Sequence, residues 1–174
     1  ELGILYWNIG KIKESSDMYR QSLSIAEKIQ MKNKVDFCLT MLEIHDNYLK
    51  AKDYFSKGSY QESNASFNNA ISLAKRTGSK EHELKCLRQL SLNYWDLNNF
   101  QAFFSLTKEA LLIARELKHR KDEGRCLNNI GLIYVDLGSY EKGIDYFKKS
   151  LLKDEYSKAI INTIIDLDNI GVAY

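Results

Sequence analysis

Apolar residues recur along this chain at spacings of three and four, which place them on one face of an α-helix. Ile144, Phe147 and Leu151 show the pattern clearly. Nine segments carry it, and Gly or Asn separates several of them. We therefore expect an all-α protein with helices at 1–9, 13–29, 34–57, 60–76, 81–97, 100–117, 121–137, 140–152 and 157–174.

The segments also repeat. The stretch from Cys86 to Tyr94 matches the stretch from Cys126 to Tyr134, an offset of 40 residues. Tyr recurs in this register at positions 6, 54, 94, 134 and 174, each time three residues after a small residue (Gly3, Ala51, Ser91, Gly131 and Gly171). We expect the small residue to let two helices approach closely, and the following Tyr to fill the space beside it.

A second helical pattern follows each of these segments after a short turn. The turns contain Gly58, Asn98 or Gly138, residue types that adopt the left-handed conformation at a helix C-terminus most easily. Each unit is therefore a helix hairpin. Because one hairpin cannot cover its own apolar face, neighbouring hairpins must stack into a solenoid.

These features resemble the tetratricopeptide repeat family. The matching features are the small-then-Tyr pair, the Gly-x-Tyr or Asn-x-Phe turn, and an aromatic residue in the second helix (Tyr19, Phe67 and Phe147). The 40-residue period is similar to that of kinesin light chains, spindle-orientation adaptors, bacterial peptide-sensing regulators and arrays fused to caspase-like CHAT domains. The resemblance implies a right-handed superhelical solenoid of antiparallel hairpins that serves as a non-catalytic scaffold.

The third unit departs from the family pattern. Phe103 and Phe104 occupy a region where the family prefers a small residue, and Thr107 replaces the second-helix aromatic. The family's terminal Pro is also absent, as expected of the 40-residue branch. We expect unusual helix packing around this unit.

The register divides residues 1–174 into one solenoid of five units. These are 1–33 (partial), 34–80, 81–120, 121–156 and 157–174 (partial), and we expect the chain to be a fragment of a longer protein. Tyr6 and Tyr54 are 48 residues apart rather than 40. Eight extra residues form about two helical turns, so the sequence predicts one helix of about 36 Å near 34–57. This extension is either neutral or provides a contact surface or a local change of superhelix pitch.

Composition narrows the function. The 25 Lys and Arg residues nearly balance 23 Asp and Glu residues, which disfavours a nucleic-acid binder. Three cysteines without a CxxC pair argue against a disulfide framework or a zinc knuckle, and Cys86 and Cys126 fit buried positions beside core leucines. The apolar runs fall well short of the roughly 18 residues of a membrane span. We expect a cytoplasmic protein.

No catalytic or cofactor motif stands out. His45, His82 and His119 are each 37 residues from the next and are interpreted as isolated. Acid pairs such as Asp122 with Glu123, or Asp166 with Asp168, are interpreted as solvated helix faces, and the basic stretch 118–121 as a solvated turn. We expect no enzyme activity, cofactor or metal.

The first helices of a tetratricopeptide solenoid line its concave side, and this places the candidate binding residues. Those predicted to bind a peptide or protein segment are Trp7, Tyr48, Lys52, Lys85, Arg88, Leu92, Trp95, Arg125, Asn128, Asn129, Leu132 and Val135. Ile4, His45, Phe55, Ile165, Asp168 and Val172 share that face. The cations among them favour an acidic peptide, since Arg binds carboxylates in a bidentate manner. The alternatives are a regulatory array that controls an effector domain of the same longer chain and, more remotely, RNA binding.

Overall fold

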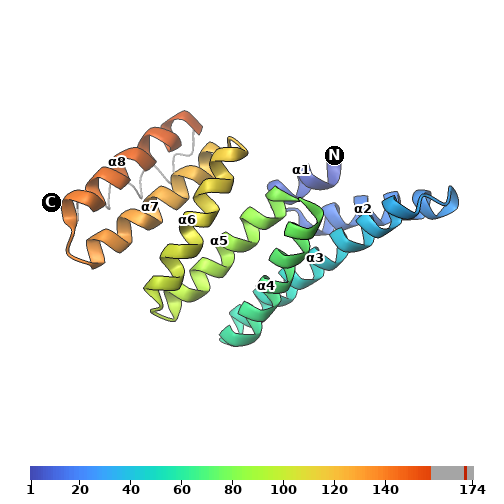
Figure 1. Ribbon diagram of the computed structural model, residues 1–174, viewed down its shortest axis with the longest axis horizontal. Coiled ribbons are helices and arrows are strands. Elements are labelled where there is room, and N and C mark those ends of the chain that lie inside the picture. The colour runs from blue at the N-terminus through green and yellow to red at the C-terminus, as the bar shows by residue number, and fades with distance from the viewer. Residues whose placement is uncertain (158–170, 172–174) are drawn as a thin grey trace. The chain divides into compact units, whose positions relative to one another are not determined.

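A computed structural model describes residues 1–157 and 171, and within them the chain forms eight α-helices and no strand (Figure 1). The helices are α1 (Leu2–Asn8), α2 (Ile12–Lys28), α3 (Lys32–Ser56), α4 (Tyr60–Thr77), α5 (Lys80–Asp96), α6 (Phe100–Glu116), α7 (Arg120–Asp136) and α8 (Tyr140–Ser157). None of these described helices is both long enough and apolar enough to cross a membrane.

The first seven helices lie within two residues of the predicted bounds. The eighth was predicted to end at 152 and instead continues to Ser157. The helix predicted at 157–174 lies outside the described residues except for its two positions 157 and 171, and Ile165, Asp166, Asp168 and Val172 lie outside them altogether.

The chain divides into two compact units, Glu1–Asn93 and Tyr94–Tyr174, and the division falls inside α5. In the first unit α1 pairs with α2 and α3 pairs with α4. In the second unit α7 pairs with α8, and α6 packs against α7.

Every helix junction from Gly10 to Gly138 uses one turn geometry. Within hairpins the left-handed residue is Gly10, Gly58, Asn98 or Gly138, as predicted. The amide one residue later donates to the carbonyl of the repeated tyrosine, for example from Ser139 to Tyr134 over 2.7 Å. This is the Schellman helix ending, so each tyrosine carbonyl closes the helix to which the tyrosine belongs. Between hairpins the same role falls to Gln30, Gly78 and Lys118.

The close approach within hairpins occurs as predicted, but another side chain fills it. A Cβ on Gly3 would lie 2.9 Å from the ring of Tyr19, and one on Gly131 would lie 2.5 Å from Phe147 Cδ1. The second-helix aromatic therefore occupies the space beside the small residue. The prediction that the following Tyr fills it was wrong, since Tyr54 is 37% exposed and Tyr134 is only half-buried.

The third hairpin is unusual because its aromatic residue has moved one helical turn earlier. Phe103 is buried at the register position that holds Ser15, Ser63 and Gly143 in the other hairpins. Thr107, at the usual aromatic position, is 1% exposed and its hydroxyl has no hydrogen-bond partner. Trp95 packs against Phe103 with ring centroids 5.0 Å apart. The expectation of altered packing is confirmed.

The eight extra residues lengthen α3 to 25 residues. By register they are residues 43–50, and three of them (Ile44, His45 and Tyr48) are 0%, 1% and 5% exposed. The insertion therefore contributes core residues to the first unit.

Candidate functional site

We use the term first-helix face for the sides of α1, α3, α5 and α7 that carry the predicted binding residues, taken within each unit separately. In the first unit the structure brings Trp7 of α1, Tyr48 of α3 and Lys85 of α5 together. Trp7 and Tyr48 are 0% and 5% exposed, so these two were wrongly placed among the surface positions. Lys52 is exposed, Arg88 is half-buried, and Leu92 is 39% exposed.

Trp7 lies at the centre of this group because α5 packs back onto α1, which Figure 1 shows beside the beginning of α5. The indole lies flat against His45 and His82, with ring centroids 4.8 Å and 4.4 Å away. The Tyr48 ring packs edge-on against another side of the indole, with the ring centroids 4.8 Å apart. Trp7, Tyr48 and Lys85, which were predicted to bind a ligand, thus contact one another, and their binding role stays a prediction.

Lys85 also turns toward Trp7. Its ammonium donates a hydrogen bond to the Trp7 carbonyl and lies 4.7 Å from the indole centroid. The Tyr48 ring is 5.8 Å away. The carbonyl belongs to the last turn of α1, where a cation is favoured by the partial negative charge of the helix end.

His45 and His82 form a buried pair, so the interpretation of the histidines as isolated was wrong for these two. Their Nε2 atoms are 3.1 Å apart. The ring centroids are 5.3 Å apart with an interplanar angle of 19°. Because the two Nε2 atoms are about 2 Å closer to each other than the ring centroids are, the rings meet edge to edge. One N–H···N hydrogen bond joins them. Their separation of 37 residues is neither 40 nor 48, which is why the repeat register gave no sign of the pair.

Two serines fix the direction of the proton in this pair. Ser16 Oγ donates to the Ile12 carbonyl over 3.0 Å and lies 2.8 Å from His45 Nδ1. We assign the proton to His45 Nδ1, because the Ser16 hydroxyl proton is already used. His45 Nε2 then accepts from His82 Nε2, and His82 Nδ1 accepts from Ser79 Oγ at 2.6 Å. All of these bonds are satisfied when both rings are neutral.

Burial keeps the pair neutral. Loss of solvation, followed by the charges of Lys85 and Arg20, lowers the pKa of His45 to about 4. Loss of solvation, His45 and Lys85 lower the pKa of His82 to about 3. The cysteines are buried as expected, and burial raises the pKa of the Cys86 thiol. These groups therefore build structure and do not present reactive charge at neutral pH.

The second unit carries the remaining candidate residues. Arg125, Asn128, Asn129, Leu132 and Val135 are all half-buried along α7. Arg125 lies 3.7 Å from Asp122. Trp95 is half-buried and packs against Phe100 and Phe103 at 5.4 Å and 5.0 Å. The binding role of these residues stays a prediction.

Two acids that join successive hairpins were missed in the sequence. Glu123 is 9% exposed, and its carboxylate lies 3.1 Å from both Arg115 and Lys153. Glu83, forty residues earlier, is 3% exposed and lies 3.8 Å from Lys75. The interpretation of Glu123 as solvated was therefore wrong. The signal was present, since each acid and its partner recur at the 40-residue period.

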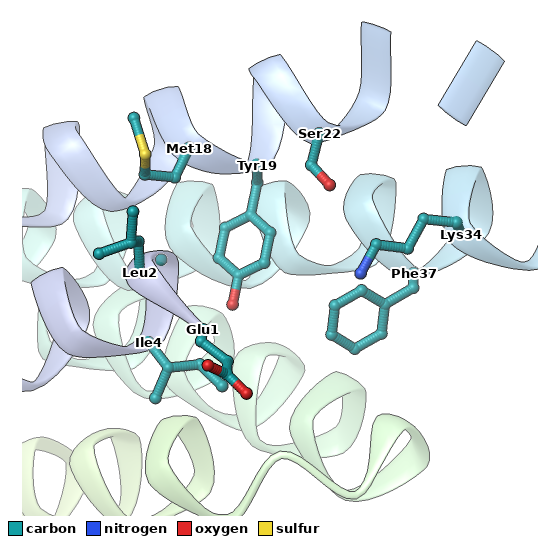
Figure 2. Close-up of a pocket in the computed structure, with 9 residues that line it drawn as sticks. Glu1, Leu2, Ile4, Met18, Tyr19, Ser22, Lys34 and Phe37 are labelled. Atoms are coloured by element: carbon teal, nitrogen blue, oxygen red, sulfur yellow. The ribbon is translucent and has the colours of Figure 1, made fainter. Parts of the chain in front are cut away.

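A pocket of 480 Å³ opens between α1, α2 and α3 (Figure 2). Leu2, Ile4 and Met18 give it apolar walls, and Tyr19 projects between Ser22 and Glu1. Lys34 lies 5.0 Å from the ring of Phe37 at its rim. Burial raises the pKa of Tyr19 to about 12, so its hydroxyl stays protonated. In the described part of the chain no three His, Cys, Asp or Glu side chains are grouped to hold a metal.

Comparison with known families and structures agrees with the repeat register. A family model described as tetratricopeptide repeat matches residues 1–29 and 124–152. No curated protein matches the chain.

The solved structures show the same fold. A STAND protein with a tetratricopeptide repeat sensor from Pyrococcus horikoshii aligns with 99% of this chain at 18% identity and a TM-score of 0.71. This chain spans only 26% of that protein. BtubC from P. vanneervenii gives 15% identity, 99% and 74% coverage of the two chains and a TM-score of 0.56.

A putative kinesin light chain from P. anserina with nearly identical TPR-like repeats gives 15% identity, 100% and 82% coverage and a TM-score of 0.57. At these identities the structures establish the fold. Proteins with such repeats are generally non-catalytic scaffolds for protein interactions. The chain therefore has an all-α solenoid fold and carries segments, at residues 1–29 and 124–152, that match the tetratricopeptide repeat.

Proposed function

We propose that this protein binds an acidic peptide or protein segment on its first-helix face and performs no catalysis. The observation that carries the proposal is the row of half-buried side chains on α7, in which Arg125, Asn128 and Leu132 follow one another at helical spacing. An Arg guanidinium pairs with carboxylates, an Asn amide pairs with a peptide backbone, and Leu offers an apolar anchor.

The first unit adds a similar and more exposed set. Arg88 is half-buried, Leu92 is 39% exposed and Lys52 is exposed. Trp7 and Tyr48 lie beneath the surface and contribute support.

A second candidate is a sensor array that controls another domain of a longer chain. It is favoured by the alignment with a protein whose tetratricopeptide repeats are described as a sensor, of which this chain spans 26%. In that case the bound segment belongs to the same polypeptide. Tetratricopeptide surfaces serve either use, so the partner must be identified by experiment.

Charge reversal tests the proposal. Arg88→Glu/Arg125→Glu removes the two guanidinium groups of the face. Arg76→Glu/Lys108→Glu makes the same change of charge at exposed positions of α4 and α6. Both proteins are screened, beside the wild type, against an array of fluorescent 15-residue peptides of graded Glu and Asp content, with circular dichroism as the check on folding.

We expect acidic peptides to bind the wild type and the α4/α6 control equally, and the Arg88/Arg125 variant at least tenfold more weakly. If both variants bound acidic peptides equally weakly, the loss of affinity would follow from net charge alone. That result would contradict a site on the first-helix face. Binding that survives in both would move the site elsewhere.

A further inference from the structure

Five side chains cluster around Trp7 in the first unit, and we call this cluster the Trp7 clasp: Trp7, His45, Tyr48, His82 and Lys85. It joins helices that are distant in sequence, since Lys85 is 78 residues from the Trp7 carbonyl that it contacts. Two of its members, His45 and Tyr48, come from the eight residues that lengthen α3. The clasp is thus tied to the eight-residue insertion in the repeat.

The clasp holds a short helix whose other anchors lie at Gly3, which packs against Tyr19 and accepts a hydrogen bond from Ser15 Oγ over 2.6 Å. α1 has seven residues, of which only Gly3 and Trp7 are buried. Leu2, Leu5 and Ile9 are 58–68% exposed. A segment with so little buried surface opens at lower free energy than the rest of its unit.

Hydrogen bonds between neutral polar groups hold the two histidine rings on which Trp7 of α1 stacks. Ser16, His45, His82 and Ser79 form one chain of bonds through the buried centre. Each such bond contributes little net stability, because water replaces it when the site opens. Because Trp7 stacks on rings that these bonds hold, a change in one of the bonds alters the contact between α1 and α5.

Closure of the clasp also engages Lys85, a cation of the first-helix face, in a hydrogen bond. Lys85 corresponds to Arg125 at the 40-residue period, and it lies one helical turn from Arg88 on α5. In the closed clasp its ammonium donates to the Trp7 carbonyl. A carboxylate that pairs with Lys85 must compete with that carbonyl.

We propose that the Trp7 clasp regulates binding on the first-helix face: closed, it withholds Lys85, Trp7 and Tyr48, and opening of α1 releases them to an acidic segment. This inference rests on the proposed function. The measured affinity is the affinity of the open state reduced by the fraction of molecules that are open. Changes that loosen the clasp without touching the binding residues must then strengthen binding.

Two loosening variants and one matched control test this. Ser79→Ala removes the donor to His82 Nδ1, and Ser16→Ala removes the partner of His45 Nδ1. Ser63→Ala is the control, because Ser63 is also a buried serine of the first unit but bonds to the Ala51 carbonyl and Asn93. Opening of α1 is followed by hydrogen exchange of residues 2–8. Binding is measured by fluorescence anisotropy with a labelled 12-residue peptide of alternating Glu and Leu.

We expect faster exchange in α1 and roughly three- to tenfold tighter peptide binding for Ser79→Ala and Ser16→Ala, the range that one lost hydrogen bond gives. Ser63→Ala should change neither. Faster exchange with unchanged affinity would overturn regulation by the clasp and leave the proposed function intact. Unchanged exchange in both variants would show that these bonds do not hold α1, and would overturn the clasp itself.

Failure of every protein to bind the peptide would refute the proposed function for acidic segments. The regulatory inference would fall with it, and faster α1 exchange in the variants would then establish the clasp as a purely structural contact. Tighter binding in Ser63→Ala as well would also overturn the inference, because general loosening would then explain the gain.

Discussion

At the scale of single residues, the uncharged state of His45 and His82 allows them to be buried together. Each Nδ1 has a serine hydroxyl as its partner, the two Nε2 atoms bond each other, and no carboxylate bonds to either ring. The nearby charges are the cations Lys85 on α5 and Arg20 on α2. A proton added to either ring therefore faces positive charge and lost solvation, with little to offset them.

This makes the protein sensitive to mild acid. The pKa values of about 4 and about 3 in the folded state lie below the unfolded value near 6.5, so the unfolded chain binds more protons. The stabilisation is fully present above pH 6.5 and is lost as the pH falls toward the folded values. We expect the free energy of unfolding to decline with a slope approaching about 1.4 kcal/mol per pH unit for each histidine.

Urea titrations between about pH 7.5 and pH 5 measure this slope before most carboxylates titrate. His82→Phe should be flatter across the same window, and His82→Gln serves if the Phe variant does not fold. The same slope in wild type and variant would mean that the pair does not cause the decline.

Thr107 presents the opposite case, a buried polar group without a partner. Its hydroxyl lies where other hairpins place an aromatic ring, and nothing accepts its hydrogen bond. Thr107→Val should raise the free energy of unfolding by about 1 kcal/mol, because it keeps the shape and removes the unpaired hydroxyl. In the matched variant Thr77→Val, loss of the bonds to the Leu73 and Ala74 carbonyls should give no gain. Thermal unfolding of both variants decides the point.

At the scale of helices and turns, the same left-handed turn recurs, but the residues that hold it differ in how easily they adopt a positive φ. Gly78 takes the left-handed conformation without strain, whereas Lys118 at the same register position holds φ 56° with a side chain attached. Lys118→Gly should therefore stabilise the second unit by about 1 kcal/mol. Gly78→Lys should destabilise the first unit by a similar amount. Urea unfolding measures both, and a loss of stability in Lys118→Gly would show that the lysine side chain contributes more than its strain removes.

Local chemistry explains which elements were predictable. Helices and hairpin turns followed from apolar spacing and from Gly58, Asn98 and Gly138, which act within a few residues of themselves. Contacts between helices that are distant in sequence were not predictable in this way. The burial of His45 depends on α5 returning to α1, and the pattern of α3 alone does not specify that path.

The candidate site shows the same limit. Arg125, Asn128 and Leu132 lie along one side of α7 because helical spacing requires it. Trp7 and Tyr48 occupy the predicted side of their helices, yet a neighbouring helix covers them. The repeat register therefore predicts which side of its helix a residue occupies. Whether that side is exposed depends on which other helices pack against it.

At the scale of the whole chain, the two compact units differ in their sensitivity to acid. The histidine pair lies entirely in Glu1–Asn93, while the described residues of the other unit contain the single histidine His119. Because repeat proteins are stabilised by contacts between neighbours, a local loss of stability need not spread along the chain. The first unit should therefore lose its native structure at a higher pH than the second.

Each unit holds one tryptophan, Trp7 or Trp95, so 5-fluorotryptophan labelling gives one ¹⁹F resonance for each. On stepwise acidification we expect the Trp7 resonance to leave its native position first, while the Trp95 resonance stays. Trp95→Phe assigns the two signals without disturbing the Trp7 clasp. Simultaneous loss of both resonances would show that the units unfold cooperatively, and prior loss of Trp95 would show that the second unit is the more acid-sensitive of the two.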